Sequence, residues 1–220
     1  MSEKHKPYGV YEKYFKRMFD VICGVMTLLV FGWLYIILAI LVKIKLGSPV
    51  LFKQERPGKN EKIFKLYKFR TMTDARDENG DFLPDEQRLT KFGRALRASS
   101  LDELPEIINI IKGEMSLIGP RPLTIQYLPF YSKEEKHRHD VRPGLSGLAQ
   151  VNGRNFIDWD HRLALDVQYV KKITFLGDLH IILQTIAKII KKEDVAVDTN
   201  KVEPNFAEER SAKLNRNKRQ

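Results

Sequence analysis

The sequence predicts an α+β protein, mainly helical, with an N-terminal membrane helix, interfacial amphipathic helices and a small cytoplasmic domain with short β elements. Two observations lead to this prediction. An uncharged apolar run extends from Val21 to Val42, and the chain after it combines amphipathic helical patterns with short strand-like stretches. A chain of 220 residues is long enough for one domain with a hydrophobic core and an appendage.

The apolar run has the length of a bilayer crossing, about 22 residues. It is too long for the central region of a cleavable signal peptide, and Lys43-Ile44-Lys45 follows it where a cleavage site would stand. The alternative is a buried core helix, but core helices of soluble domains rarely run this far without a charge. We therefore expect the segment to enter the membrane.

The path of this helix through the membrane is less constrained, because both of its flanks are basic. Cytoplasmic flanks carry the lysines and arginines, so a simple span would place one basic flank on the wrong side. A re-entrant segment would satisfy both flanks and would leave both chain ends cytoplasmic. Re-entry needs a helix break, for which Gly32 is a weak candidate, and the residues leave spanning and re-entry open. The basic residues are Lys4, Lys6, Lys13, Lys16 and Arg17 before the run and Lys43, Lys45 and Lys53 after it.

The rest of the chain shows several short elements. Leu51 to Met72 predicts short strands around the turn Arg56-Pro57-Gly58. Val10 to Ile22 has an apolar stripe at helical spacing, which predicts an interfacial helix. Phe175 to Lys192 is a second amphipathic helix, for which a packed surface position and an interfacial position are both open. Other helices are expected over Gln87–Arg97, Leu101–Ile111 and Asp158–Lys171.

Composition limits the chemistry. The net charge of +10 indicates a polyanionic partner, and nucleic acid, anionic lipid and nucleotide diphosphates all fit. The single cysteine, Cys23, excludes an internal disulfide and a cysteine-based zinc site. His137 and His139 flank Arg138 in a charged loop, where solvated side chains are expected rather than a metal site.

The motif Ser100-Leu101-Asp102-Glu103-Leu104-Pro105 has two interpretations. Ser-x-x-Glu is a helix capping box, in which Ser100 caps the helix and Glu103 reaches back, and the motif alone favours this structural role. Its surroundings favour chemistry, because several segments place Arg or Lys beside a stiffening Pro or Gly, as binding a fixed diphosphate requires. These segments are Lys68-Phe69-Arg70-Thr71-Met72, Thr90-x-x-Gly93-Arg94, Arg97, Gly119-Pro120-Arg121-Pro122 and Arg142-Pro143-Gly144.

A carboxylate among such cations is ionised and can attack phosphorus as a nucleophile. The leaving phosphate must then be neutralised, typically by Mg²⁺ with Arg and Lys, and Mg²⁺ is commonly held by one or two carboxylates. Asp102 and Glu103 could supply these carboxylates. Adjacent helical positions point in different directions, so the two are expected to have different roles.

At these motifs the sequence resembles the bacterial sugar transferase family, the monotopic phosphoglycosyl transferases, over Phe15 to about Lys192. It is most similar to compact single-domain members, including the diacetylbacillosamine-phosphate transferase of protein N-glycosylation and exopolysaccharide initiators. The shared motifs are Lys16-Arg17-x-Phe19-Asp20, Gly47-Ser48-Pro49-Val50, Gln54-x-Arg56-x-Gly58, Lys68 to Met72, Leu101 to Pro105, Gly113 to Pro122, Arg142 to Gly147, Gln150 to Arg154 and Asp166-x-x-Tyr169-Val170.

The resemblance implies a transferase that moves a phosphosugar from a UDP-sugar to undecaprenyl phosphate at the cytoplasmic face of the bacterial inner membrane. Asp102 would attack the sugar-linked phosphate, release UMP and carry the phosphosugar covalently until the lipid phosphate takes it. Glu103 would assist, and Mg²⁺ is the expected cofactor, held by Asp102 and Glu103. Contacts to phosphate or nucleotide are expected from Lys68, Arg70, Arg97, Arg121, Arg142, Arg154 and Asp166. For Asp166, a structural cap or ion pair is an equal alternative.

The expected organisation follows. Residues 1–20 form an interfacial amphipathic helix, 21–46 a hydrophobic membrane segment, 47–192 a cytoplasmic catalytic domain with interfacial helices and 193–220 a polar, disordered tail. The two basic flanks together with the resemblance imply that the segment 21–46 is re-entrant, with Gly32 as a weak substitute for a helix break. One departure from the family is that close relatives carry a helix-breaking Ser-Pro pair where Gly32-Trp33 stands here.

The product would initiate an exopolysaccharide, a capsule or a glycoprotein glycan, and neither the sugar nor the pathway is readable from these residues. A homodimer is left open. The competing hypotheses are a membrane-tethered basic binding protein without catalysis and a nucleic-acid-binding protein. The second is disfavoured, because no helix-turn-helix, RRM or OB signature is present.

Overall fold

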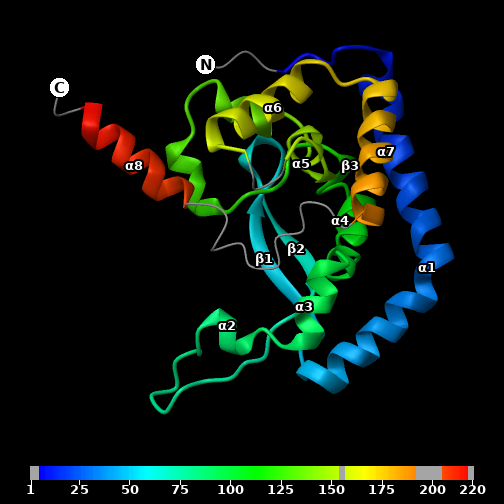
Figure 1. The fold of residues 1–220 in the computed structure, drawn as a ribbon. Coiled ribbons are helices and arrows are strands. Elements are labelled where there is room, and N and C mark those ends of the chain that lie inside the picture. The colour runs from blue at the N-terminus through cyan, green and yellow to red at the C-terminus, as the bar shows by residue number, and fades with distance from the viewer. Residues whose placement is uncertain (1–4, 154–156, 192–204, 218–220) are drawn as a thin grey trace.

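The computed structural model describes residues 5–153, 157–191 and 205–217. A long helix and several shorter ones surround two small β-sheets (Figure 1). The α-helices are α1 (Lys16–Leu46), α2 (Asp85–Arg88), α3 (Lys91–Ala98), α4 (Glu106–Lys112), α5 (Leu148–Val151), α6 (Trp159–Lys171), α7 (Phe175–Lys191) and α8 (Phe206–Asn217). A π-helix, η1 (Tyr11–Phe15), precedes α1, and the 3₁₀ turns are η2 (Lys59–Glu61), η3 (Leu101–Glu103), η4 (Ile125–Phe130) and η5 (Glu135–His139).

The strands are β1 (Leu51–Pro57), β2 (Ile63–Phe69), β3 (Ser116–Ile118) and β4 (Gly144–Ser146). Strands β1 and β2 are the short strands expected around the Arg56-Pro57-Gly58 turn, and they pair as an antiparallel hairpin with Leu51 opposite Phe69 and Pro57 opposite Ile63. Strands β3 and β4 pair in parallel. The α+β, mainly helical class predicted from the sequence is confirmed.

Helix α1 is one continuous helix that also includes the position of Gly32, and η1 leads directly into it at Lys16. The expected boundary between an interfacial helix and a membrane helix is therefore not a break in the backbone. In the most apolar stretch of Tyr11–Leu46, 11% of the residues are buried in the protein. A buried core helix would have most of its surface covered, so that alternative does not hold, and the protein is membrane-associated.

Both ends of α1 pack against the same globular body. Near its start, the buried carboxylate of Asp20 accepts hydrogen bonds of 3.0 Å from the Ser116 hydroxyl and from the Leu117 amide. Near its end, Leu38 and Val42 pack with Phe69 and other buried residues of the domain. Figure 1 shows α1 descending along one side of the domain and then turning beneath it. The apolar side chains along the middle of the helix remain exposed: Leu29, Val30, Phe31, Trp33, Ile36, Ile37 and Ile40.

Helix α7 lies beside the first half of α1 (Figure 1). The ring of Phe175, at its start, packs edge-on against Tyr11 and Phe19, and Asp178 is bound by Tyr11 and Lys16. The outer face of α7 is apolar and exposed, with Leu176, Leu183, Ile186, Ile189 and Ile190 on it. An exposed apolar stripe next to the exposed α1 favours the interfacial position over the packed surface position.

Two of the expected helices are interrupted. The stretch Gln87–Arg97 is divided at Leu89, which pairs with Met72, and Thr90 then caps α3 by accepting a bond from the Gly93 amide. The stretch Leu101–Ile111 is divided at Pro105, which lacks the amide proton needed to continue the helical ladder. Asp158–Lys171 is helical as expected, with Asp158 as the cap of α6.

The prediction of a disordered tail over 193–220 does not hold for residues 206–217, which form α8, while residues 192–204 lie outside the described part. Its polar composition misled the prediction, because a single apolar side chain, the fully buried Phe206, docks this helix.

The expectation of a solvated His139 is also wrong. Its ring is 5% exposed and packs against Tyr131, and burial followed by the charge of Arg138 lowers the pKa of His139 to about 3.

Candidate active site

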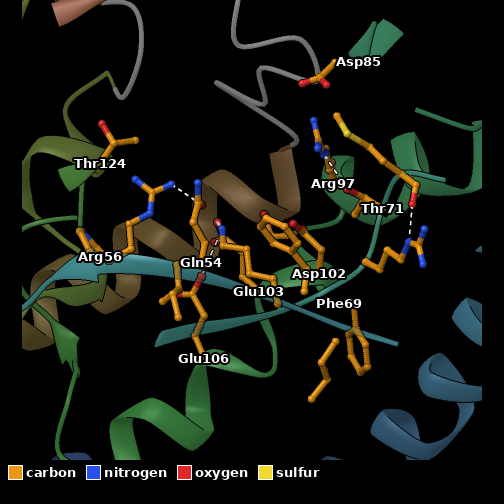
Figure 2. Close-up of a pocket in the computed structure, with 18 of the residues that line it drawn as sticks. Gln54, Arg56, Phe69, Thr71, Asp85, Arg97, Asp102, Glu103, Glu106 and Thr124 are labelled. Carbon is orange, nitrogen blue, oxygen red and sulfur yellow. Dashed lines mark hydrogen bonds and ion pairs between the residues drawn. The ribbon is translucent and has the colours of Figure 1, made fainter. Parts of the chain in front are cut away.

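A cleft of about 760 Å³ opens between the β1–β2 hairpin, the turn η3 and the loops before α3 and α6. The charged residues that line it are Arg56, Lys68, Arg70, Asp74, Asp85, Arg88, Arg97, Asp102, Glu103, Glu106, Arg121 and Arg162. Figure 2 shows the three acidic residues Asp102, Glu103 and Glu106 together, with Arg56 to the left of them and Arg97 above Asp102 in this view. The cleft thus combines a small acidic group with an excess of cations.

One wall of the cleft is built by close packing of α3 on the end of β2. A Cβ atom on Gly93 would lie 1.8 Å from the carbonyl oxygen of Thr71, so only glycine allows this approach. The packing brings Arg97 to Thr71, whose hydroxyl accepts a bond of 3.1 Å from the Arg97 Nε. Among the described residues no carboxylate forms an ion pair with Arg97, which leaves its charge directed at the cleft.

Asp102 occupies the turn η3, which follows Ser100 in the left-handed backbone region at φ 55°. Its side chain is 9% exposed, and no hydrogen bond or ion pair joins its carboxylate to the described part of the chain. Burial and then the charge of Glu103 raise the pKa of Asp102 to about 6, against the opposing effect of Lys68, Arg97 and Arg121. Asp102 is therefore ionised at neutral pH. No hydrogen-bond donor among the described residues occupies its carboxylate oxygens, so these oxygens are available for nucleophilic attack.

Glu103 has the opposite environment. Its Oε1 accepts bonds from Lys68 Nζ at 2.7 Å and from Arg121 at 2.8 Å. Burial would raise its pKa, but Arg121 and Lys68 outweigh burial and hold the pKa of Glu103 well below its usual range. Glu106 lies 3.2 Å from Lys68, and burial together with the charge of Glu103 raises the pKa of Glu106. Glu103 is thus a permanent anion that orients two cations at the cleft.

The capping-box interpretation of this motif does not match the geometry. Ser100 forms no side-chain capping bond, and the carboxylate of Glu103 is directed to Lys68 and Arg121 instead of back to the backbone. The motif therefore holds its two carboxylates for another purpose.

Arg121 is carried by a rigid loop that follows β3. The amide of Gly119 donates to Ser146 at 2.9 Å, and the amide of Gly144 donates to Pro120 at 3.0 Å. A Cβ on Gly119 would lie 2.5 Å from the Arg142 carbonyl oxygen, so this crossing also requires glycine. The segment Arg142-Pro143-Gly144 thereby supports the Arg121 loop from behind.

Asp166 lies outside the residues that line the cleft, in a buried ion pair with Arg138 at 2.8 Å. Arg138 also donates to the backbone oxygen of Arg121 at 2.6 Å. Asp166 thus acts on the cleft only through Arg138, by fixing the loop that carries Arg121.

The remaining predicted residues have different positions. Lys68, Arg97 and Arg121 line the cleft, and so does Arg70, although its guanidinium is bound to the carbonyls of Met72 and Ser48 and to Asp74. Arg142 is not among the lining residues, because it donates to the Gly113 carbonyl at the end of α4, where partial negative charge attracts a cation. Arg154 lies outside the described residues.

Several lining residues are not indicated as site residues by the motifs. Glu106 stands one position after the Leu101 to Pro105 motif, and its acidic character was an available signal. Arg56 belongs to a shared motif, but the sequence indicated only that it forms part of the Arg56-Pro57-Gly58 turn. Burial, then the charge of Arg121, lowers the pKa of Arg56 to about 10, and its side chain donates to Gln54. Trp159 and Arg162 reach the cleft only through tertiary packing of α6.

The acidic group of the cleft, Asp102 with Glu103, has the chemistry of a shared Mg²⁺ site rather than of a complete one. Within residues 5–153, 157–191 and 205–217, no cluster of three or more His, Cys, Asp or Glu side chains could hold a metal ion alone. Mg²⁺ commonly takes one or two carboxylates and completes its shell with water and substrate phosphates. Both cations on Glu103 contact Oε1, which leaves Oε2 outside these contacts. The Asp102 carboxylate with Oε2 of Glu103 fits such a shared site.

An exposed apolar helix and a cationic cleft define a membrane-associated protein with a site for anionic substrates. The model of the bacterial sugar transferase family matches residues 11–192. An uncharacterized sugar transferase, EpsL of Bacillus subtilis, is 48% identical over 180 residues, which cover 82% of this chain and 89% of that protein. The UDP-glucose:undecaprenyl-phosphate glucose-1-phosphate transferase of Caulobacter vibrioides is 35% identical over 190 residues, 81% of this chain and 71% of that protein.

The undecaprenyl-phosphate galactose phosphotransferase of Salmonella typhimurium is 36% identical over 201 residues. The match covers 84% of this chain but only 42% of the Salmonella protein. The chain belongs to the bacterial sugar transferase family. It is an enzyme, a phosphoglycosyl transferase, as the resemblance implied.

Proposed function

We propose that the protein transfers a phosphosugar from a UDP-sugar to undecaprenyl phosphate, through a covalent intermediate on Asp102. The observation that supports this most directly is the Asp102 carboxylate, which is ionised at neutral pH, faces the cleft and has Lys68, Arg97 and Arg121 as its electrostatic neighbours. Relatives whose names give both substrates add support. The product would start the assembly of an exopolysaccharide, a capsule or a glycoprotein glycan.

In the first step, a carboxylate oxygen of Asp102 attacks the phosphorus bonded to the sugar. The bond from that phosphorus to the bridging oxygen breaks, and UMP leaves with the electron pair. In the second step, a phosphate oxygen of the lipid attacks the same phosphorus. The bond to Asp102 breaks, the carboxylate is regenerated, and the lipid carries a diphosphate-linked sugar.

The cations around the carboxylate supply the electrostatic part of the mechanism. Arg97 and Arg121 can neutralise charge on the transferring and leaving phosphates, and Glu103 fixes Lys68 and Arg121 in place. We further propose that Asp102 and Glu103 would hold Mg²⁺. The charge of the bound ion would assist departure of the leaving phosphate. Arg70 and Arg142 have structural partners, which favours a supporting role for each.

The membrane face is proposed to be the cytoplasmic face of the bacterial inner membrane. A straight helix of 31 residues is about 46 Å long, so a simple span would carry one end far from the domain. Instead, the Asp20 end and the Val42 end of α1 both pack on the domain, which favours a re-entrant or in-plane helix. The exposed face of α7 would lie at the same interface and bring the cleft within reach of a lipid phosphate.

The test is a UMP-release assay with purified protein, a UDP-sugar panel, undecaprenyl phosphate and Mg²⁺. Asp102→Asn should abolish UMP release while the protein stays folded. Asp81→Asn, an exposed carboxylate outside the cleft, is the matched control and should retain activity. Donor labelled in the sugar should leave label on wild-type protein when the lipid is withheld. Activity that survives Asp102→Asn would refute the assignment.

A further inference from the structure

Helix α8 follows the family match, which ends at residue 192, and it has a specific docking site on the domain. Phe206, its first residue, is fully buried. Its ring centroid lies 5.0 Å from that of Trp159, 5.2 Å from that of Tyr127 and 5.4 Å from that of Tyr131. These separations are those of favourable aromatic pairs, so Phe206 is a built-in anchor.

A second contact fixes the same helix. The guanidinium of Arg210, one turn after Phe206, binds Asp160 at 2.6 Å and also pairs with Glu135. Asp160 belongs to the first turn of α6 and Glu135 to η5, so α8 ties together two elements. The aromatic anchor and the ion pairs fix both the position and the rotation of the helix.

Two of the rings that Phe206 contacts, Tyr127 and Trp159, also line the cleft. They pack edge-on against each other with centroids 5.6 Å apart, and Arg162 lies 4.7 Å above the Trp159 ring. In Figure 2, Thr124, which precedes the η4 turn that carries Tyr127, lies on the opposite side of Glu103 and Glu106 from Asp102 in this view. This part of the cleft wall therefore lies away from the reacting carboxylate.

The orientation of the wall indicates which substrate it contacts. In Figure 1, α8 lies on the opposite side of the β1–β2 hairpin from α1, which carries the exposed apolar residues. Under the proposed function, the lipid acceptor would approach from the side of α1, and the polar donor from the side away from it. Trp159 and Arg162 are 3% and 4% exposed, whereas Tyr127 is half-buried, so Tyr127 presents most of this wall to the cleft. An aromatic ring in the wall of a cationic cleft is suited to the flat face of a nucleobase or a sugar ring.

We propose that α8 is a positioning element for the donor, in which Phe206 holds the Tyr127–Trp159 wall in the orientation that binds the non-reacting end of the nucleotide sugar. The proposal rests on the proposed function for the identity of the donor. Phe206 acts through the two rings and does not touch the reacting atoms. Removing it should weaken donor binding and leave both the chemical step and acceptor binding in place.

The experiment compares Phe206→Ala with Phe206→Leu, which keeps an apolar side chain, and with Glu208→Ala, an exposed control on the same helix. Loss of the ring contacts should raise KM for the UDP-sugar about three- to tenfold. The kcat and the KM for undecaprenyl phosphate should change by less than about twofold, since uniform binding affects KM alone. Phe206→Leu should recover part of the loss. An unchanged donor KM, or an equal change in both KM values, would overturn the proposal.

Two further measurements keep the proposal testable. If Phe206→Ala does not fold, Arg210→Gln should give a smaller rise in donor KM, and no rise would count against the proposal. Trp159 fluorescence in a Trp33→Phe background reports UDP binding without turnover, and Phe206→Leu should weaken that binding. Absence of UMP release by the wild-type protein would defeat the proposed function instead. Normal turnover with unaltered UDP titration in the variants would defeat only the role of α8.

Discussion

Asp102 and Glu103 are adjacent in one 3₁₀ turn, yet their carboxylates have opposite environments. Lys68 and Arg121 bind Glu103 directly, whereas no bond joins the Asp102 carboxylate to any described residue. Accordingly, the pKa of Glu103 lies well below its usual range, and burial raises the pKa of Asp102 to about 6. The same turn thus supplies a fixed anion that orders cations and a more basic carboxylate that is free to react.

The first prediction concerns pH. Asp102 must be ionised to attack, so kcat/KM for the donor should fall about tenfold per pH unit below about pH 6 and level off above about pH 7. A pH profile of UMP release at low donor concentration measures this directly. An ordinary aspartate, with a pKa of 3.8, would give no such fall above pH 5. A flat profile from pH 5 to 8 would therefore contradict the role of Asp102.

The second prediction concerns stability. A raised folded-state pKa means that folding disfavours the charged form of Asp102. Its contribution to stability is fully present below pH 3.8 and is lost as the pH rises through about 6. Asp102→Asn removes this charge and should increase the free energy of unfolding at pH 8 by up to about 3 kcal/mol. Thermal unfolding in detergent at pH 8 should show a higher Tm for the inactive variant, and a lower Tm would contradict the burial cost.

The third prediction couples the two carboxylates. Glu103→Gln removes a negative neighbour of Asp102 and releases Lys68 and Arg121 from their shared partner. Both effects favour ionised Asp102, so the acid limb of residual activity should move to lower pH. Two partly buried cations also lose their anion, and the free energy of unfolding should fall by about 1–3 kcal/mol, less than for a fully buried pair. The matched control is Glu55→Gln on the exposed side of β1. This variant should change neither the pH of the acid limb nor the free energy of unfolding. A shift of the limb to higher pH would refute the coupling.

The sequence predicted the parts of this site that depend on local patterns. The alternation in 51–72 predicted the short strands β1 and β2, and the charged loops predicted that Lys68, Arg97 and Arg121 would accompany Asp102. Trp159 and Phe206 could not be predicted, because their contacts depend on packing between segments far apart in the chain. The polarity of the C-terminal segment concealed Phe206, since one buried ring barely changes the composition. Arg142 showed the converse, because its motif resembled a phosphate loop while its side chain caps α4.

The fourth prediction separates support from binding at Asp166. The ion pair of Asp166 with Arg138 is nearly inaccessible, so Asp166→Asn leaves a buried guanidinium without its anion. This should lower the free energy of unfolding by about 3–5 kcal/mol. Because Asp166 does not line the cleft, donor KM of the folded fraction should rise less than for Arg121→Ala. Denaturant unfolding measures the loss of stability, and donor kinetics measure the change in KM. A stable variant with a large rise in donor KM would instead indicate that Asp166 contacts the substrate directly.

The last prediction concerns the path of α1. Both ends of this helix pack on the domain, through Asp20 on Ser116 and through Val42 beside Phe69. Residues before and after α1 should therefore be on the same side of the membrane. In a Cys23→Ala background, Lys6→Cys and Lys53→Cys place single thiols at exposed positions on the two flanks. A membrane-impermeant maleimide should leave both unlabelled in intact cells and label both after permeabilisation. Labelling of only one thiol in intact cells would establish a span, and the packing of one end of α1 would then have to be abandoned.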